Sequence, residues 1–181
     1  MVRPVVATAL LVALAACSQV PAPTSQGATA EAPAAALQLP NLGHPRPGIH
    51  TAGDVGPDDV PAIAAAGIRH VIDLRPDGET PGFDEAGAMR AAGIRYDNLP
   101  IAGADDLGRE RVAAFDRLLA EADGPLLVHC ASSNRVGAMA ALRAAWIEGK
   151  PVEEAISEGR AWGLRSLEGA VRERLAAMPD Q

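Results

Sequence analysis

Cysteine is scarce in this chain, and its scarcity limits the chemistry available. The 181 residues include only Cys17 and Cys130, and Cys17 lies in an N-terminal segment that we expect to be processed. The folded part then holds one thiol and cannot form an intramolecular disulfide. His44, His50 and His70 show no metal-ligand spacing among themselves or with Cys130. We therefore expect neither a metal ion nor another cofactor.

Long basic runs and long hydrophobic runs are also absent. The formal net charge is −7, so we expect no nucleic-acid partner, because proteins that bind nucleic acids gather Lys and Arg on one face. The apolar run at residues 5–14 is shorter than the ~20 residues that a membrane-spanning helix needs. One basic residue precedes this run and Leu-Ala-Ala-Cys ends it, which predicts a secretory signal peptide with a lipobox over residues 1–17.

The lipobox-like ending predicts where the protein works. It resembles bacterial sequences in which the cysteine becomes the lipid-modified N-terminus, so we expect lipidation of Cys17. The membrane is then a partner through the lipid anchor, and the chain belongs to the cell envelope. It faces the periplasm there, and Ser18 slightly favours the outer membrane. A lone thiol is a liability in an oxidising compartment, so the presence of Cys130 suggests a chemical use.

Aromatic residues make up only 3% of the chain, and their distribution predicts the domain limits. All five lie between Phe83 and Trp162. Residues 18–47 instead contain six prolines and seven alanines, which predicts a disordered tether. Residues 48–178 remain as one domain, which is long enough to bury a single core.

Strand and helix patterns alternate within this domain. Four strands are expected, at about residues 48–51, 68–74, 94–99 and 125–130. Helices are expected at about residues 58–66, 83–92, 107–122, 134–147, 152–160 and 164–177. Gly67 and Gly93 end two of these helices in Ala-Gly-Ile joints. The alternation predicts an α/β domain of three layers, with a parallel sheet of about four strands flanked by helices.

The most informative segment, residues 126–137, reads LLVHCASSNRVG. An apolar strand ends at His129, Cys130 follows, and Arg135 begins a helical pattern. Ligands of parallel sheets bind beyond the carboxyl ends of strands, and helix N-termini favour anions. Backbone amides and the Arg135 guanidinium would stabilise a Cys130 thiolate and hold a tetrahedral oxyanion. This arrangement suits phosphoryl transfer through a phospho-cysteine.

We expect the loop around Cys130 to form the binding site. The predicted substrate-binding residues are His129, Ala131, Ser132, Ser133, Asn134 and Arg135. The role of His129 stays open between two alternatives. It could orient the loop and help to keep Cys130 ionised, or it could equally be a hydrogen-bonded core histidine.

The loop resembles the His-Cys-x5-Arg signature of cysteine-dependent phosphatases, although only four residues separate Cys130 from Arg135. This shorter spacing is shared by rhodanese-type sulfurtransferases. It is also similar to a bacterial dual-specificity-phosphatase-like family found in beta-lactamase-hydrolase-like proteins and fused to NAD kinase. Other segments that resemble this family are residues 48–53, 66–75, 92–96, 99–101 and 154–164.

The resemblance implies a cysteine-phosphatase fold and hydrolysis of a phosphomonoester on a protein or a small molecule. Two positions depart from the family. Ser133 stands where glycine is common, and glycine there indicates a backbone with positive φ. Val136 follows the arginine, where many phosphatases have Ser or Thr.

The departures keep two alternatives open. The short spacing is compatible with a sulfurtransferase that carries a persulfide on Cys130. Ser133 and Val136 are compatible with an anion-binding module without efficient turnover.

A phosphatase also needs an acid that protonates the leaving oxygen. The resemblance places it on the loop after the third expected strand, where Asp105 and Asp106 are candidates, or where one of them caps the next helix. Asp73, near the end of the second strand, is expected to bind nearby backbone. Arg75, Asp77 and Glu79 are expected to be solvated charges around a turn.

Overall fold

The computed structural model describes residues 37–177. The predicted signal peptide, the lipidation of Cys17 and the tether up to residue 36 lie outside the described residues. Within residues 37–177, no helix has the length and apolarity that crossing a membrane requires.

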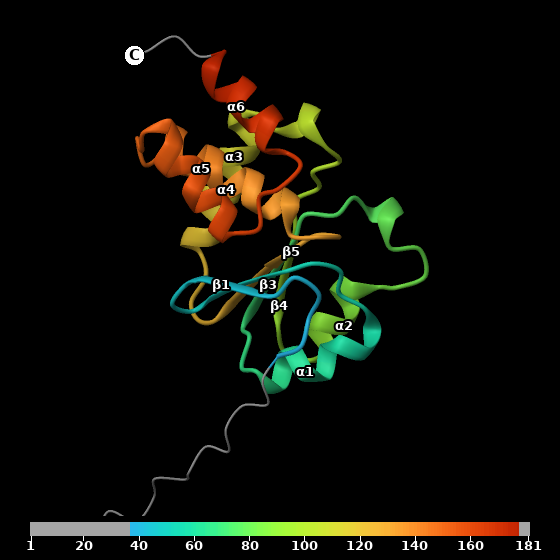
Figure 1. The fold of residues 1–181 in the computed structure, drawn as a ribbon. Coiled ribbons are helices and arrows are strands. Elements are labelled where there is room, and N and C mark those ends of the chain that lie inside the picture. Colours follow the sequence, from blue (N-terminus) through green and yellow to red (C-terminus); the bar gives the residue numbers. More distant parts are fainter. Residues whose placement is uncertain (1–36, 178–181) are drawn as a thin grey trace, which may run out of the picture. The chain divides into compact units, whose positions relative to one another are not determined.

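A five-stranded sheet with the order β1-β2-β5-β3-β4 forms the centre of the domain (Figure 1). Its strands are β1 (Gly43–Arg46), β2 (Ile49–Ala52), β3 (His70–Asp73), β4 (Arg95–Asn98) and β5 (Leu126–His129). Strands β2, β5, β3 and β4 run parallel to one another, which confirms the four predicted strands. Strand β1 pairs antiparallel with β2, so the sheet is mixed rather than purely parallel.

Strand β1 belongs to a segment that the sequence assigned to the tether. Pro45 lies in β1. Proline lacks a backbone donor and argues against a strand, so the sequence pattern did not indicate this edge strand. The turn after β1 contains Gly48, whose φ of 75° lies in the left-handed region. Leu37 and Leu39 are buried in the core ahead of this hairpin. The folded domain therefore includes residues 37–47, and the predicted boundary at residue 48 comes too late.

Helices cover both faces of the sheet, as predicted for three layers (Figure 1). The helices are α1 (Val60–Ala65), α2 (Glu85–Ala91), α3 (Arg109–Ala120), α4 (Asn134–Trp146), α5 (Val152–Ala161) and α6 (Glu168–Ala176), with 3-10 turns η1 (Pro57–Asp59), η2 (Asp77–Glu79) and η3 (Ala104–Asp106). Leu127 packs in the cluster on the α1 and α2 side. Its neighbours Leu126 and Val128 pack in the cluster with α3 to α6. This alternation of side chains along β5 holds the three layers together.

The glycine joints behave as the sequence predicts. Gly67 and Gly93 have φ values of 77° and 76° just after α1 and α2, so each ends its helix in the left-handed conformation. Each joint leads directly into the next parallel strand, Gly67 into β3 and Gly93 into β4.

Gly137 allows α4 and α5 to pack closely, and we expect Gly137→Ala to be strongly destabilising. A Cβ at this position would lie 2.0 Å from the Leu164 nitrogen and 2.6 Å from the Gly159 oxygen. Both are backbone atoms that cannot rotate away, so the free energy of unfolding should fall by about 3 kcal/mol or more. Urea unfolding would measure this loss. In the control, Gly169→Ala at an exposed position of α6, the new Cβ meets open space, and stability should rise by about 0.5–1 kcal/mol.

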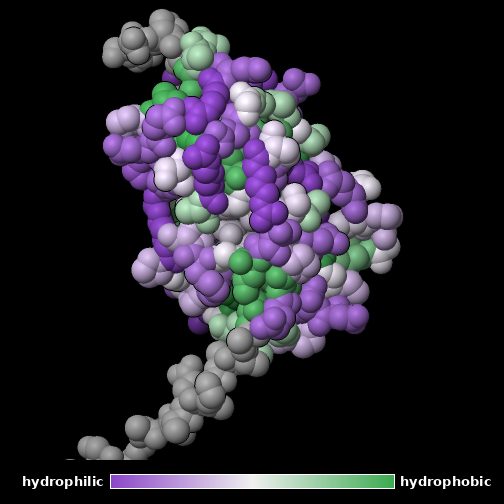
Figure 2. All heavy atoms as spheres, viewed as in Figure 1, coloured by the Kyte–Doolittle hydropathy of each residue, from purple (hydrophilic) through white to green (hydrophobic). Residues whose placement is uncertain are grey.

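Hydrophilic side chains cover most of the face shown in Figure 2. One surface group of charges surrounds Glu148, which pairs with Arg143 and, at 2.6 Å, with Lys150. Hydrogen bonding from Lys150 is the largest effect on the Glu148 carboxyl, and with the smaller contribution of Arg143 it lowers the pKa from 4.5 to about 2 against the opposing effect of burial.

We expect Glu148→Gln to weaken the fold at neutral pH and not at acid pH. A carboxyl whose folded pKa is lowered stabilises the protein above its unfolded pKa and loses this contribution as pH falls through the folded value. The free energy of unfolding should drop by about 1 kcal/mol at pH 7, since the pair is partly screened by solvent. The difference between the two proteins should vanish near pH 2. Urea unfolding across this range, with exposed Glu173→Gln as control, would measure the effect.

Candidate active site

Cys130 lies immediately after β5, at the carboxyl edge of the sheet, and is fully buried. Its backbone N–H donates to the Ala52 oxygen at 3.4 Å, so the strand pairing continues to the cysteine. Helix α4 begins four residues later at Asn134. The predicted strand, loop and helix are therefore present, and the loop ends at the N-terminus of a 13-residue helix.

Ser133 adopts the backbone conformation for which the family commonly uses glycine. Its φ is 67°, in the left-handed region, which a residue with a Cβ adopts only at a cost. The buried Ser133 hydroxyl donates to the Trp162 oxygen at 3.1 Å, which offsets part of this cost. Gly163 makes the approach possible, because a Cβ there would lie 2.6 Å from Ser133 Oγ. The loop therefore has a positive φ at position 133 although the residue is serine, and the Ser133 side chain is directed toward Trp162.

Of the other loop residues, Asn134 binds the segment before α6, and Ala131 and Ser132 form an exposed rim. The Asn134 side chain accepts a hydrogen bond from the Arg165 N–H and donates one to Ser166 Oγ, both at 2.8 Å. It thus fastens the segment before α6 to the head of α4. Ala131 and Ser132 are exposed. Their backbone N–H groups remain the part of this rim suited to a ligand anion.

Arg135 pairs with a carboxylate, and Cys130 is near enough to influence its pKa. Its Nη1 donates to the Ile101 oxygen and to Glu79 Oε1, both at 2.8 Å, and its Nη2 donates to Glu79 Oε2 at 2.6 Å. The hydrogen bonds with Glu79 raise the pKa of Arg135, and the adjacent Cys130 raises it further, against the opposing effect of burial. The structure therefore brings together the two residues on which the predicted chemistry depends.

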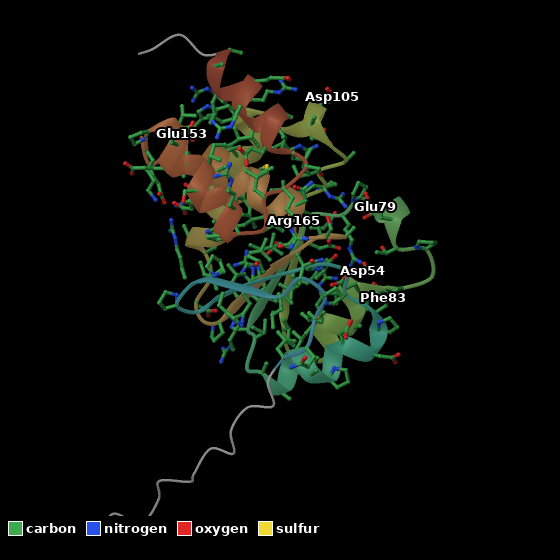
Figure 3. The ribbon with its side chains drawn as sticks, in the orientation of Figure 1. Asp54, Glu79, Phe83, Asp105, Glu153 and Arg165 are labelled. Carbon is green, nitrogen blue, oxygen red and sulfur yellow. The ribbon has the colours of Figure 1, made fainter. Side chains whose placement is uncertain are left out.

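The two candidate acids lie on η3 and make other contacts. Asp105 is fully exposed, with Oδ1 3.9 Å from Arg174 Nη2, and Figure 3 shows it at the outer edge of the domain. Asp106 Oδ2 accepts a hydrogen bond from the Ala102 N–H at 2.6 Å. The N-cap of α3 is Gly108, so neither aspartate caps this helix. Among the described residues, the carboxylate that contacts Arg135 is that of Glu79.

Arg75, Asp77 and Glu79 were expected to be solvated, and the structure corrects this expectation for Arg75, whereas Asp77 and Glu79 are exposed. Arg75 is buried and forms ion pairs with Asp73, Glu85 and the exposed Asp54. The expectation for Asp73 is confirmed, because its Oδ1 accepts the Arg75 N–H at 2.8 Å. Strand order is the signal that was missed: β3 lies beside β5, so the segment after Asp73 must reach the Cys130 loop.

His129 faces this buried charged group rather than the loop. Its Nε2 lies 3.0 Å from Glu85 Oε1 and 3.7 Å from Asp73 Oδ1, and the ring is fully buried. The placement matches a core histidine, although neither ring nitrogen has a hydrogen-bond partner among the described residues, so the hydrogen-bonded form of that alternative is not what the structure shows. Asp73, Glu85 and His129 bring ligand atoms within 4.8 Å of one another, as a metal site would. The Arg75 guanidinium pairs with both carboxylates and offsets part of their combined negative charge, so the four residues form a buried ionic network.

A hollow of about 200 Å³ lies beside Glu79. Apolar residues form part of its wall, namely Val55, Pro57, Pro81 and Phe83, and Arg75 and Glu79 are among its polar lining. Figure 3 shows Glu79, Asp54 and Phe83 on the same side of the domain. The hollow is therefore next to the carboxylate that binds Arg135.

Comparisons with known proteins agree with this geometry. Residues 46–147 match the family described as beta-lactamase hydrolase-like protein, phosphatase-like domain. A beta-lactamase hydrolase-like protein of Agrobacterium fabrum is 37% identical over 81 residues, which are 42% of this chain and 19% of that protein. The chain thus spans about a fifth of the length of this curated relative.

Solved structures confirm the fold. A candidate phosphatase from Neisseria meningitidis superposes with a TM-score of 0.60 and 29% identity, covering 71% of this chain and 92% of that one. Tk-PTP in its active form gives a TM-score of 0.58 at 17% identity, covering 78% and 100%. The α/β fold is that of cysteine-phosphatase structures. Since the family match covers more than half of the sequence, the chain belongs to the phosphatase-like domain family of beta-lactamase hydrolase-like proteins.

Proposed function

We propose that the protein is a cysteine-dependent phosphatase that hydrolyses a phosphomonoester through a phospho-cysteine on Cys130. The observation that carries this proposal is the position of Cys130 directly after β5, on the loop that leads to Arg135 in the first turn of α4. A thiolate there is stabilised by a guanidinium and by the positive end of the helix dipole. The same groups bind the oxygens of a phosphate, so nucleophile and electrophile meet in one cradle.

The reaction then has two steps. Cys130 Sγ attacks phosphorus and forms the S–P bond, while the P–O bond to the alcohol breaks and the leaving oxygen takes a proton. Water then attacks phosphorus, the S–P bond breaks, and phosphate and the Cys130 thiolate are released. Arg135 donates two parallel hydrogen bonds to the phosphoryl oxygens in both steps.

Hydrolysis of p-nitrophenyl phosphate by the purified full chain tests the proposal. We expect turnover that stops when vanadate occupies the site, because vanadate resembles the transferring phosphoryl group. Absence of turnover on this and other phosphomonoesters would overturn the proposal.

A sulfurtransferase is the second candidate, favoured by the four-residue spacing between Cys130 and Arg135. Transfer of sulfur from thiosulfate to cyanide, without phosphatase activity, would select it. Phosphate binding without any turnover would select an anion-binding module. The backbone argument for this last alternative is weaker now, because Ser133 reaches the required positive φ.

A further inference from the structure

Glu79 occupies one of the two-donor edges of Arg135 that can bind an oxyanion. Its two carboxylate oxygens accept from Nη1 and Nη2 at 2.8 and 2.6 Å, which is the bidentate geometry of Arg with an oxyanion. The Glu79 side chain is 37% exposed and that of Arg135 is 11% exposed, so the pair lies at the mouth of the site. A substrate phosphate that binds the Nη1/Nη2 end of the guanidinium therefore replaces this carboxylate.

Glu79 also lines the adjoining hollow of about 200 Å³. It therefore borders two compartments, the Arg135 guanidinium on one side and the apolar wall formed with Pro81 and Phe83 on the other. A phosphomonoester with its phosphate on Arg135 and its alcohol in the hollow has its bridging oxygen at the boundary between them. Figure 3 shows Glu79 and Phe83 on this side of the domain, with Asp105 apart on η3.

We propose, resting on the phosphatase function proposed above, that Glu79 is displaced by the substrate phosphate and then acts as the proton donor to the leaving oxygen. As the phosphate dianion displaces it from Arg135, Glu79 takes up a proton from solvent, and this is the proton that it donates to the leaving oxygen. Glu79 follows β3 on the short turn η2, outside the buried core, and its side chain can leave Arg135 without disturbing the sheet.

The proton balance of the two steps is complete with this residue. As Cys130 Sγ attacks phosphorus, the P–O bond breaks and the Glu79 proton passes to the leaving oxygen, which departs as an alcohol. Glu79 is then a carboxylate beside the phospho-cysteine. It accepts a proton from the attacking water while the S–P bond breaks, and it ends protonated beside the released phosphate. When phosphate dissociates, Glu79 loses this proton to solvent and pairs with Arg135 again.

The contacts of the two aspartates do not favour them for this step. Asp105 is fully exposed and lies near Arg174, and Asp106 accepts from the backbone of Ala102. The contacts of Glu79 connect it directly to the residue that binds phosphate.

Glu79→Gln tests the proposal, with Asp77→Asn on the same turn as the matched control. The phenolate of phenyl phosphate is a poor leaving group, whereas p-nitrophenolate departs without much help from an acid. A positioned acid contributes ~10²–10⁴-fold, so kcat for phenyl phosphate should fall about 100-fold in Glu79→Gln. The loss with p-nitrophenyl phosphate should stay below about tenfold, and Asp77→Asn should match the wild type on both substrates.

Binding of inorganic phosphate, measured by calorimetry, is a second readout that needs no turnover. Removing the competing carboxylate should tighten phosphate binding to Glu79→Gln about fivefold, the size expected for a partly exposed ion pair. Unchanged or weaker phosphate binding would overturn the displacement.

The substrate series separates the two proposals. A wild type that is inactive on both esters sinks the phosphatase function, whereas a wild type that is active on both leaves it standing. In the latter case, an equal loss on both esters in Glu79→Gln would overturn the proton-donor role. So would a steep leaving-group dependence in Asp105→Asn or Asp106→Asn in place of Glu79→Gln.

Discussion

Cys130→Ser should lose phosphatase turnover by about 10⁴-fold or more while still binding phosphate, because removal of a nucleophile leaves only positioning and charge stabilisation. A serine hydroxyl is similar in shape to the thiol, and the backbone amides and Arg135 remain in place. Turnover of p-nitrophenyl phosphate and calorimetric binding of inorganic phosphate would measure the two properties separately.

Cys17→Ser is the matched control, because it replaces the chain's other cysteine, which lies outside the described domain. In detergent solution this variant should retain wild-type turnover. A Cys130→Ser protein with substantial phosphatase activity would show that the nucleophile is a different group. Loss of phosphate binding together with turnover would instead point to a collapsed loop, which urea unfolding would reveal.

Arg135→Lys should reduce kcat/KM by about 10²–10³-fold, although the positive charge is kept. Lysine is a compact point charge and cannot donate two parallel hydrogen bonds to two oxygens of a phosphoryl group. The substitution also replaces the fork that binds Glu79 and the Ile101 oxygen. Steady-state kinetics with p-nitrophenyl phosphate would give the loss.

The exposed Arg165, which donates to Asn41 at 3.1 Å, provides the control. Arg165→Lys should change kcat/KM less than about threefold, since an exposed hydrogen bond contributes little. Near-normal activity in Arg135→Lys would mean that charge alone suffices and that bidentate geometry is not used. Urea unfolding of both variants would show whether the fold is kept.

Most of the architecture was predictable because it rests on local pattern. Apolar strands, glycine joints and amphipathic helices each leave a signal within about ten residues. The same holds for the nucleophile, since Cys130 and Arg135 lie on one short loop. The cost at Ser133 was also predictable from residue type, and the structure shows the positive φ. The β1 hairpin was missed because its prolines resemble a linker.

The partners of Arg135 and Arg75 could not be predicted from local pattern. Glu79 lies 56 positions before Arg135, and nothing near it in the sequence distinguishes it from a solvated turn charge. Their contact depends on the order of strands, which places β3 next to β5. The same holds for Arg75, because its buried partner Glu85 lies on a different element, α2.

The pairing of Asp73 with His129 in the sheet register gives the site a common foundation. The segment with Cys130 and the segment with Glu79 both leave the sheet after this row. The buried contacts of Arg75 with Asp73 and of His129 with Glu85 stabilise the row. The loop with the nucleophile and the segment that lines the hollow are thus different parts of the chain that start from the same row of the sheet. Thr80, Pro81 and Phe83 line the hollow beyond Glu79, so substitutions at these three positions should change which alcohol fits while Cys130 and Glu79 stay in place.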